Sequence, residues 1–235
     1  MSSRWVESCV ARPAAVGAEP VVLSWSGGKD SALALQAVLA DEALHVEALV
    51  TTLTAGYDRI SMHGVRRELL ERQAAAVGIP LVVATIPMRA SNDSYEAAQR
   101  AALAPFRERG VRRVVCGDLF LEDIREYRQR LFATIGMEGM YPVWGLDTRT
   151  LARRFIADGF RAILVCVDPK QIDARFAGRE LDAALLAELP ASADPCGENG
   201  EFHTFVYDGP IFREPVAVRR GGVVERDGFV FQDLL

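Results

Sequence analysis

The chain has 235 residues, of which 50% are hydrophobic and 25% are charged, a balance that lets it bury a core and excludes a wholly disordered chain. The formal net charge is −5 and no long Lys/Arg run is present, so we expect no nucleic-acid partner, although a local basic patch is compatible with this charge. No stretch of about 18 consecutive apolar residues occurs and residues 1–20 hold no apolar segment, so we expect no membrane helix, no secretory signal and a cytoplasmic location.

Residues 20–116 alternate between short apolar strands and amphipathic helices. The spacing predicts strands over 21–25, 46–53, 81–86 and 111–116, and helices over 31–39, 65–77 and 95–109, with Pro105 kinking or breaking the last. Such alternation is typical of a parallel sheet with helices on both faces. Residues 1–19 are rich in Ala, Ser, Pro and Gly, and we expect them to be a mobile segment.

The regular alternation of strands and helices ends after Asp118. The pattern predicts helices over 122–134, 148–158 and 182–189, a strand over 162–167, and β segments over 202–207, 216–219, 223–224 and 229–231. Gly136, Gly139 and Pro142 cluster between these two parts. We therefore divide the chain into a domain over 20–136 and a smaller α+β domain over 137–235.

The metal-ligating side chains are scattered. Four cysteines (Cys9, Cys116, Cys166, Cys196) and three histidines (His45, His63, His203) lack the short spacing of a structural zinc site. Cys116 and Cys166 stand in apolar runs, where a cysteine behaves as a small hydrophobe. We expect four reduced thiols and no disulfide.

The loop between the first predicted strand and helix is the most informative segment. Its sequence is Ser26-Gly27-Gly28-Lys29-Asp30-Ser31. Two glycines allow a tight turn, and the free amides at the start of the helix attract anions such as phosphate. The two serines add hydroxyl donors, Lys29 adds a positive charge, and Asp30 either caps the helix or approaches a Mg²⁺ that accompanies the phosphates. The loop fits neither the Walker A nor the dinucleotide-binding glycine pattern, and an ordinary Gly-Gly turn is the alternative.

This loop resembles the pyrophosphate loop (PP-loop) of the N-type ATP pyrophosphatases. Other segments resemble the diphthine–ammonia ligase (diphthamide synthase) family: RISMHGVR at 59–66, GDLFLEDIR at 117–125, CGENGEFHTF at 196–205 and DGPIF at 208–212. The resemblance implies a Rossmann-like, adenine nucleotide α hydrolase-like fold with a five-stranded parallel sheet. It makes 20–136 the ATP pyrophosphatase domain and 137–235 the acceptor-binding domain.

The resemblance also implies an activity. The family adenylates a carboxylate with ATP, releasing pyrophosphate, and then forms an amide from ammonia or another amine. The chain is too short for an added glutaminase domain, so we expect free ammonia or an amine. The acceptor would be the diphthine of elongation factor 2 in an archaeon or eukaryote, or a small carboxylate in a bacterium. A homodimer is left open.

Several residues are candidates for this chemistry. Ligands of parallel sheets bind beyond the carboxyl ends of the strands, where Thr51, Leu53 and Asp118 are expected. We expect ATP to contact Ser26 to Ser31, Thr51 and Leu53, and Mg²⁺ to lie near Asp30 and Asp118. The remaining assignments follow: catalytic roles for Lys29, Asp118, Glu198, Glu201 and His203, and substrate binding by His63, Asn199, Arg125 and Arg128.

Each candidate has a simpler interpretation. Asp118 would be a turn residue, His63 a solvent-facing side chain, and the Glu198–His203 segment a solvated loop. Arg125 and Arg128 share a helix face and would equally pair with Glu122 or Asp123. Two other functions also stay open. One is a PP-loop sulfurtransferase that uses Cys116 or Cys196, and the other is an ATP-binding regulator without catalysis.

Overall fold

The computed structural model describes residue 11 and residues 14–56, 59–60 and 64–235. Five parallel strands form the first sheet, in the spatial order β4-β2-β1-β5-β6. Their bounds are β1 (Glu19–Ser24), β2 (Leu44–Thr54), β4 (Leu81–Ile86), β5 (Arg113–Val115) and β6 (Glu138–Met140). The short β3 (Arg59–Ile60) adds an antiparallel pair at the end of β2. The predicted parallel α/β sheet is confirmed.

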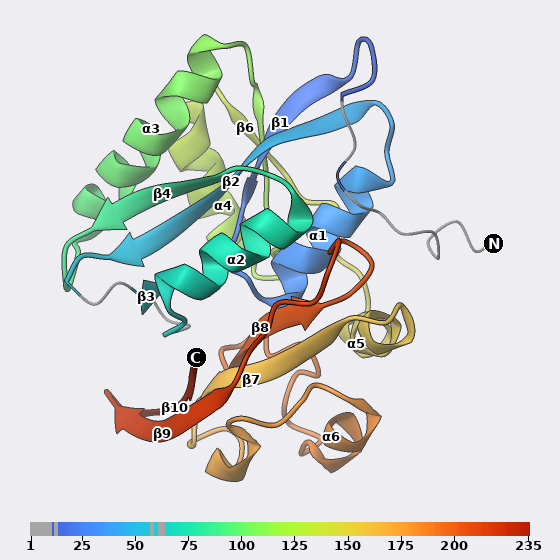
Figure 1. The fold of residues 1–235 in the computed structure, drawn as a ribbon. Coiled ribbons are helices and arrows are strands. Elements are labelled where there is room, and N and C mark those ends of the chain that lie inside the picture. The colour runs from blue at the N-terminus through green and yellow to red at the C-terminus, as the bar shows by residue number, and fades with distance from the viewer. Residues whose placement is uncertain (1–10, 12–13, 57–58, 61–63) are drawn as a thin grey trace.

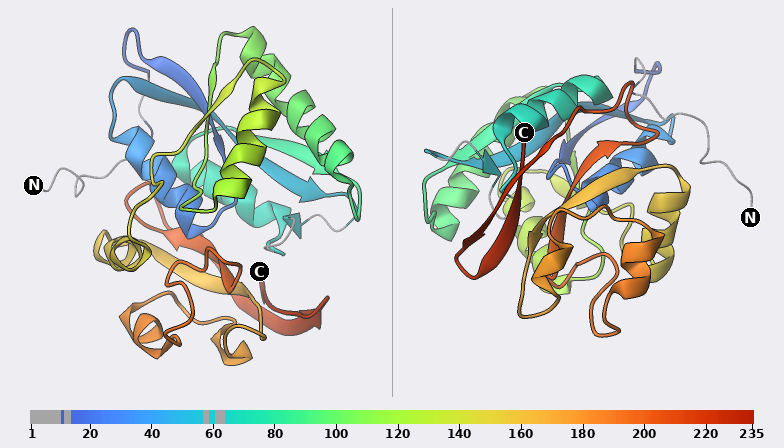
Figure 2. Two further views of the ribbon diagram at one scale, coloured as in Figure 1. Left: turned by 180° about the vertical axis from the view of Figure 1, so that it is seen from behind. Right: turned by 60° about the horizontal axis from the view of Figure 1, so that its bottom comes forward.

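Helices cover both faces of this sheet, as Figures 1 and 2 show. α1 (Lys29–Leu39) and α2 (Arg67–Val77) lie on one face, and α3 (Asn92–Glu108) and α4 (Glu122–Ala133) lie on the other. Side chains of β1 separate the two cores: Val21 and Leu23 pack with α1 and α2, whereas Val22 packs with α3 and α4. Burial of alternate side chains on opposite faces is what a strand with period two produces.

The C-terminal part forms a second, antiparallel sheet in the order β8-β7-β10-β9. Its elements are α5 (Thr148–Ala157), β7 (Arg161–Val167), the 3₁₀ helix η1 (Ala174–Phe176), α6 (Ala183–Glu188), β8 (Phe202–Asp208), β9 (Arg220–Arg226) and β10 (Phe229–Leu234). This sheet lies beside α1, and one buried cluster extends from the first sheet through α1 into β7 and β8. The C-terminal part therefore packs directly on the helix that follows the Gly-rich loop.

Some sequence predictions differ from the structure. The segment 216–219 is not a strand: Val216 is buried and its amide donates to the Tyr207 carbonyl, and β9 begins only at Arg220. Pro105 does not break α3, which continues to Glu108. Pro105 is exposed, so the carbonyl one turn before it, which loses its helical partner, can bond to water.

Two further differences concern the division of the chain and its N-terminal segment. β6 was not predicted, and it extends the first sheet beyond the predicted division at residue 136. Most of the predicted mobile segment 1–19 lies outside the described residues, and Glu19 already belongs to β1. Within the described part of the chain, no helix combines the length and apolar character needed to cross a bilayer.

Candidate active site

The Gly-rich loop connects β1 to α1 at the carboxyl end of the parallel sheet. Gly28 is the N-cap of α1, and as a glycine it offers no side chain to the first amides of the helix. Gly27 has a φ of +74°, in the left-handed region that favours glycine. The Ser26 and Ser31 hydroxyls lie 3.1 Å apart, and the Ser31 hydroxyl donates to the Gly28 carbonyl. The local sequence thus builds a tight turn with hydroxyls beside the positive end of a helix dipole.

Two residues from elsewhere in the chain fix this loop. Gln73 of α2 donates to the carbonyls of Gly27 and Val206, at 3.0 and 2.5 Å, and accepts from the Trp25 indole at 3.0 Å. Thr204 of β8 accepts a hydrogen bond from the Lys29 amide at 3.0 Å. The loop is therefore held between α2 and the C-terminal sheet.

A pocket of about 220 Å³ opens at this loop. Its lining comes from three regions: the loop and β1, the segment after β5 with α4, and the segment before and within β8. The lining residues are Ser24, Ser26, Gly28, Lys29, Asp30, Ser31, Gly117, Asp118, Arg128, Gly197, Glu198, Phe202, His203 and Thr204. Candidates from distant parts of the sequence are thus brought into one polar pocket.

Lys29, which is buried, and Asp30, which is partly exposed, form an ion pair in the pocket, with Lys29 Nζ 2.8 Å from Asp30 Oδ2. Burial alone would lower the pKa of Lys29, but the charge and hydrogen bond of Asp30 hold that pKa above its usual value. Lys29 is therefore charged at neutral pH, and its ammonium also lies 5.7 Å from the centre of the Phe202 ring. The second oxygen of Asp30, Oδ1, is buried without a hydrogen-bond partner.

Asp118 and Arg128 form a second charge pair on the opposite wall. Arg128 Nε donates to Asp118 Oδ1 at 3.2 Å and lies 3.0 Å from Oδ2 without hydrogen-bond geometry. Asp118 Oδ2 is therefore a second buried carboxylate oxygen with no hydrogen bond. Gly117 brings this wall close, because a Cβ there would lie 2.7 Å from the backbone of Asp30.

Glu198 and His203 both have strongly shifted pKa values. Burial raises the pKa of Glu198 to about 7, against a hydrogen bond from the Leu119 amide that lowers it. Burial, with the nearby charge of Lys29, lowers the pKa of His203 to about 4. At neutral pH His203 is therefore uncharged, while Glu198 exchanges its proton readily.

Seven candidates are not part of the pocket lining: Gly27, which forms the turn of the loop itself, and six others. Glu201 is buried in its own loop, where Oε1 accepts from the Asp194 amide and from the Asn199 side chain and Oε2 has no partner. Arg125 pairs with Glu122, as its simpler interpretation expected, and lies over the Trp144 ring. The other three are placed as follows: Thr51 and Leu53 are buried in β2, and His63 lies outside the described residues.

Six lining or supporting residues were missed by sequence reasoning: Ser24, Gln73, Gly117, Gly197, Phe202 and Thr204. Four of them stand inside the family-like segments and had a signal there: Gly117, Gly197, Phe202 and Thr204. Gln73 reads as an ordinary polar position of an amphipathic helix, and only its complete burial marks it. Its role depends on a bond to Gly27, far away in the sequence.

The described cysteines are poorly suited to sulfur chemistry. Burial raises the pKa values of Cys116, Cys166 and Cys196 to about 12, so each is a thiol at neutral pH. All three are free cysteines and Cys9 lies outside the described residues.

The pocket offers a divalent cation two carboxylates, Asp30 and Asp118. Among the residues that the structure describes, no group of three or more His, Cys, Asp or Glu side chains could hold a metal. Mg²⁺, however, is usually held by only one or two carboxylates together with substrate phosphates. The unpartnered oxygens of Asp30 and Asp118, facing a phosphate-type loop, fit that donor set.

Comparison with known proteins identifies the family of the chain. The model of the diphthamide synthase N-terminal domain matches residues 19–139, and that of the diphthamide synthase C-terminal domain matches residues 147–230. The chain belongs to the diphthamide synthase family. The two matches include every lining residue of the pocket.

Two curated relatives carry the name diphthine–ammonia ligase. The Danio rerio protein is 26% identical over 216 residues, which cover 82% of this chain and 84% of that protein. The Schizosaccharomyces pombe protein is 28% identical over 95 residues, 39% of this chain and 16% of that protein, so the match spans about a sixth of its length. A solved structure described as a predicted subunit of tRNA methyltransferase from Methanocaldococcus jannaschii aligns with a TM-score of 0.39 and 18% identity over 62% of this chain and 80% of that one, a similarity too low to bear on function.

Proposed function

We propose that this protein is an ATP-dependent, AMP-forming amide ligase of the diphthine–ammonia ligase type. ATP would be adenylyl donor, a carboxylate the acceptor, and ammonia or an amine the nitrogen source. The observation that carries the proposal is the pocket itself, where the start of α1, Lys29 and the carboxylates Asp30, Asp118 and Glu198 face one another.

The loop is suited to the pyrophosphate portion of ATP. The start of α1 carries a partial positive charge, and Lys29 and two serine hydroxyls stand beside it. A pocket of about 220 Å³ is smaller than the ~300–1,000 Å³ of whole-ligand sites. It therefore suits the phosphates, and the adenosine end would extend past it, with the β2 end at Thr51 and Leu53 proposed as its neighbour.

The first chemical step joins the acceptor to AMP. A carboxylate oxygen of the acceptor attacks the α-phosphorus, the bond to the β-phosphate oxygen breaks, and pyrophosphate leaves. Lys29 neutralises charge on the departing pyrophosphate, and Arg128 lies on the wall where the acceptor carboxylate would approach. Asp30 and Asp118 would hold Mg²⁺, which when bound supplies positive charge to the phosphates.

The second step forms the amide. Ammonia attacks the acyl carbon, the bond to the AMP oxygen breaks, and the nitrogen must lose one proton. Glu198, with its pKa near 7, is suited to accept that proton or to deprotonate an ammonium ion first. His203 is uncharged and would serve as a hydrogen-bonding neighbour rather than as a cation.

The acceptor follows from the family name of the relatives rather than from the pocket. We propose a diphthine-bearing protein, elongation factor 2, for an archaeal or eukaryotic source, and a small carboxylate for a bacterial one. The nitrogen would come from free ammonia, and the protein would work in the cytoplasm. The sulfurtransferase alternative is disfavoured, because the described cysteines are thiols at neutral pH.

Product analysis tests this proposal. The protein is incubated with ATP, Mg²⁺, ammonium and a candidate acceptor, and the phosphorus products are quantified. We expect AMP and pyrophosphate in equal amounts with amide, and a loss of at least about 100-fold in Asp30→Asn or Lys29→Met. Formation of ADP and phosphate, or full activity in both variants, would overturn the proposal. Arg112→Met, at an exposed residue remote from the pocket, is the matched control.

A further inference from the structure

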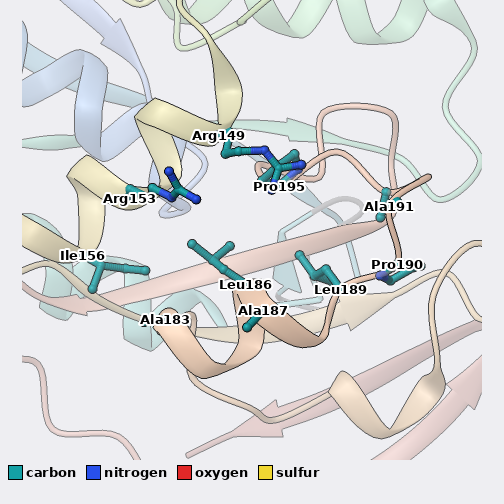
Figure 3. A pocket seen from close by; sticks show the side chains of 11 residues that line it. Arg149, Arg153, Ile156, Ala183, Leu186, Ala187, Leu189, Pro190, Ala191 and Pro195 are labelled. Atoms are coloured by element: carbon teal, nitrogen blue, oxygen red, sulfur yellow. The ribbon is translucent and has the colours of Figure 1, made fainter.

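A second pocket, larger than the one at the loop, lies between α5 and α6. It encloses about 510 Å³ and shares no lining residue with the ATP pocket. Figure 3 shows side chains of α5 along one side and those of α6 and the following loop along the other. Its volume is within the ~300–1,000 Å³ of small-molecule sites.

The walls of this pocket combine positive charge with apolar surface. Arg149 and Arg153, one helical turn apart on α5, both point to it, and neither has an ion-pair partner within the described part of the chain. Leu186, Leu189 and Ile156 supply apolar surface, and none of the carboxylates that the structure describes lines the pocket. Asp147 lies close enough for the two arginines to lower its pKa, behind the larger effect of its bond to Thr150.

This combination selects one class of ligand. Two guanidiniums at adjacent turns match the oxygens of a carboxylate or phosphate, and the apolar wall favours a hydrocarbon body on the same molecule. We propose that the pocket between α5 and α6 is a binding site for a small organic anion with an apolar body. A purely inorganic anion would contact only the arginines, and a purely apolar molecule would contact only the apolar wall.

The pocket is also joined to the ATP site through Asp194. Asp194 stands between the lining residues Ala193 and Pro195. Its side chain accepts from the Thr148 hydroxyl at 2.6 Å and from the amides of Cys196 and Glu198 at 2.9 and 3.2 Å. A ligand that shifts this segment therefore shifts Glu198, and the second site would act as an effector site for ATP binding.

Calorimetry with octanoate tests the site without using ATP or activity. We expect saturable binding of one octanoate per chain, with octanol and inorganic phosphate binding at least about tenfold more weakly, because each lacks one half of the ligand. The double variant Arg149→Ala/Arg153→Ala should weaken octanoate binding by about tenfold or more, and Arg149→Lys/Arg153→Lys should restore part of it. Octyl phosphate, run in parallel, distinguishes a phosphate from a carboxylate as the preferred anion.

A matched control removes two arginines elsewhere. Arg130→Ala/Arg219→Ala has the same change in charge at exposed positions outside the pocket and should bind octanoate as the wild type does. Equal weakening in both double variants, or no saturable binding to the wild type, would overturn the site.

The coupling has its own readout. Saturating octanoate should change the dissociation constant of ATP by about fivefold or more, and Thr148→Val, which removes one bond to Asp194, should reduce that effect. An unchanged ATP affinity with octanoate bound would overturn the coupling. A protein that binds octanoate but no ATP would instead contradict the proposed function and leave this site standing.

Discussion

Gly117→Ala tests the closest contact within the proposed ATP site. A Cβ at this position would lie 2.7 Å from the carbonyl carbon and oxygen of Asp30 and 2.9 Å from the Ser31 amide nitrogen. These are backbone atoms at the start of α1, so no side chain can rotate away. Ordinary contact begins at 3.4 Å, which means that the two walls must separate by about 0.7 Å, the difference between 3.4 and 2.7 Å.

The size of the effect follows from that separation. Overpacking of this kind costs about 1–3 kcal/mol of folding free energy. The displacement falls directly between Asp30 and Asp118, so we expect ATP affinity to fall by about tenfold or more and catalysis by up to ~100-fold. ATP binding is measured by calorimetry and stability by urea denaturation. Gly222→Ala is the matched control, because it lies in an extended strand with nothing within 4 Å of the added Cβ.

The two variants should differ clearly in ATP affinity and in stability. Gly222→Ala should bind ATP as the wild type does and change stability by less than about 0.5 kcal/mol. If Gly117→Ala also keeps wild-type ATP affinity, the pocket between Asp30 and Asp118 is not where ATP binds.

Three further predictions follow from the same contacts. The folded pKa of Glu198 is raised from 4.5 to about 7, so wild-type stability falls relative to Glu198→Gln as pH rises from 4.5 to about 7, by up to about 2–3 kcal/mol, and levels off above that; equal stability profiles of the two proteins between pH 4.5 and 8 would contradict this. Gln73→Leu leaves the Trp25 indole without its acceptor and should cost about 2–4 kcal/mol in urea denaturation, and a neutral effect would show that Gln73 does not fix the loop. Alkylation at pH 8, followed by mass spectrometry, should be far slower at Cys116 and Cys196 in the native than in the unfolded protein, and Cys196→Ser should keep ligase activity; a need for the Cys196 thiol would favour sulfur transfer.

The sequence predicted best what is local. The Gly-rich loop, the strand before it and the helix after it are neighbours in the chain, and glycine spacing with apolar periodicity describes them well. β6 escaped prediction because Glu138–Met140 has no apolar run, and its place comes from pairing with β5. Register and pairing depend on contacts that no local pattern encodes.

The site residues show the same contrast between local sequence and long-range packing. Arg125 and Arg128 share one helix face, yet only Arg128 lines the pocket while Arg125 lies over Trp144. Glu198 and Glu201 stand three residues apart, yet only Glu198 reaches the pocket, because Glu201 turns back to the Asp194 amide. Spacing restricts which side chains can meet, and the packing of the C-terminal sheet on α1 decides which of them do.

The most direct measurement of the central claim follows an oxygen atom. The acceptor carboxylate is labelled with ¹⁸O, the reaction is run with ATP, Mg²⁺ and ammonium, and the AMP is examined by mass spectrometry. If the carboxylate attacks the α-phosphorus, the amide keeps one labelled oxygen and AMP carries the other. AMP without label, or label found in inorganic phosphate beside ADP, would contradict adenylation at this site.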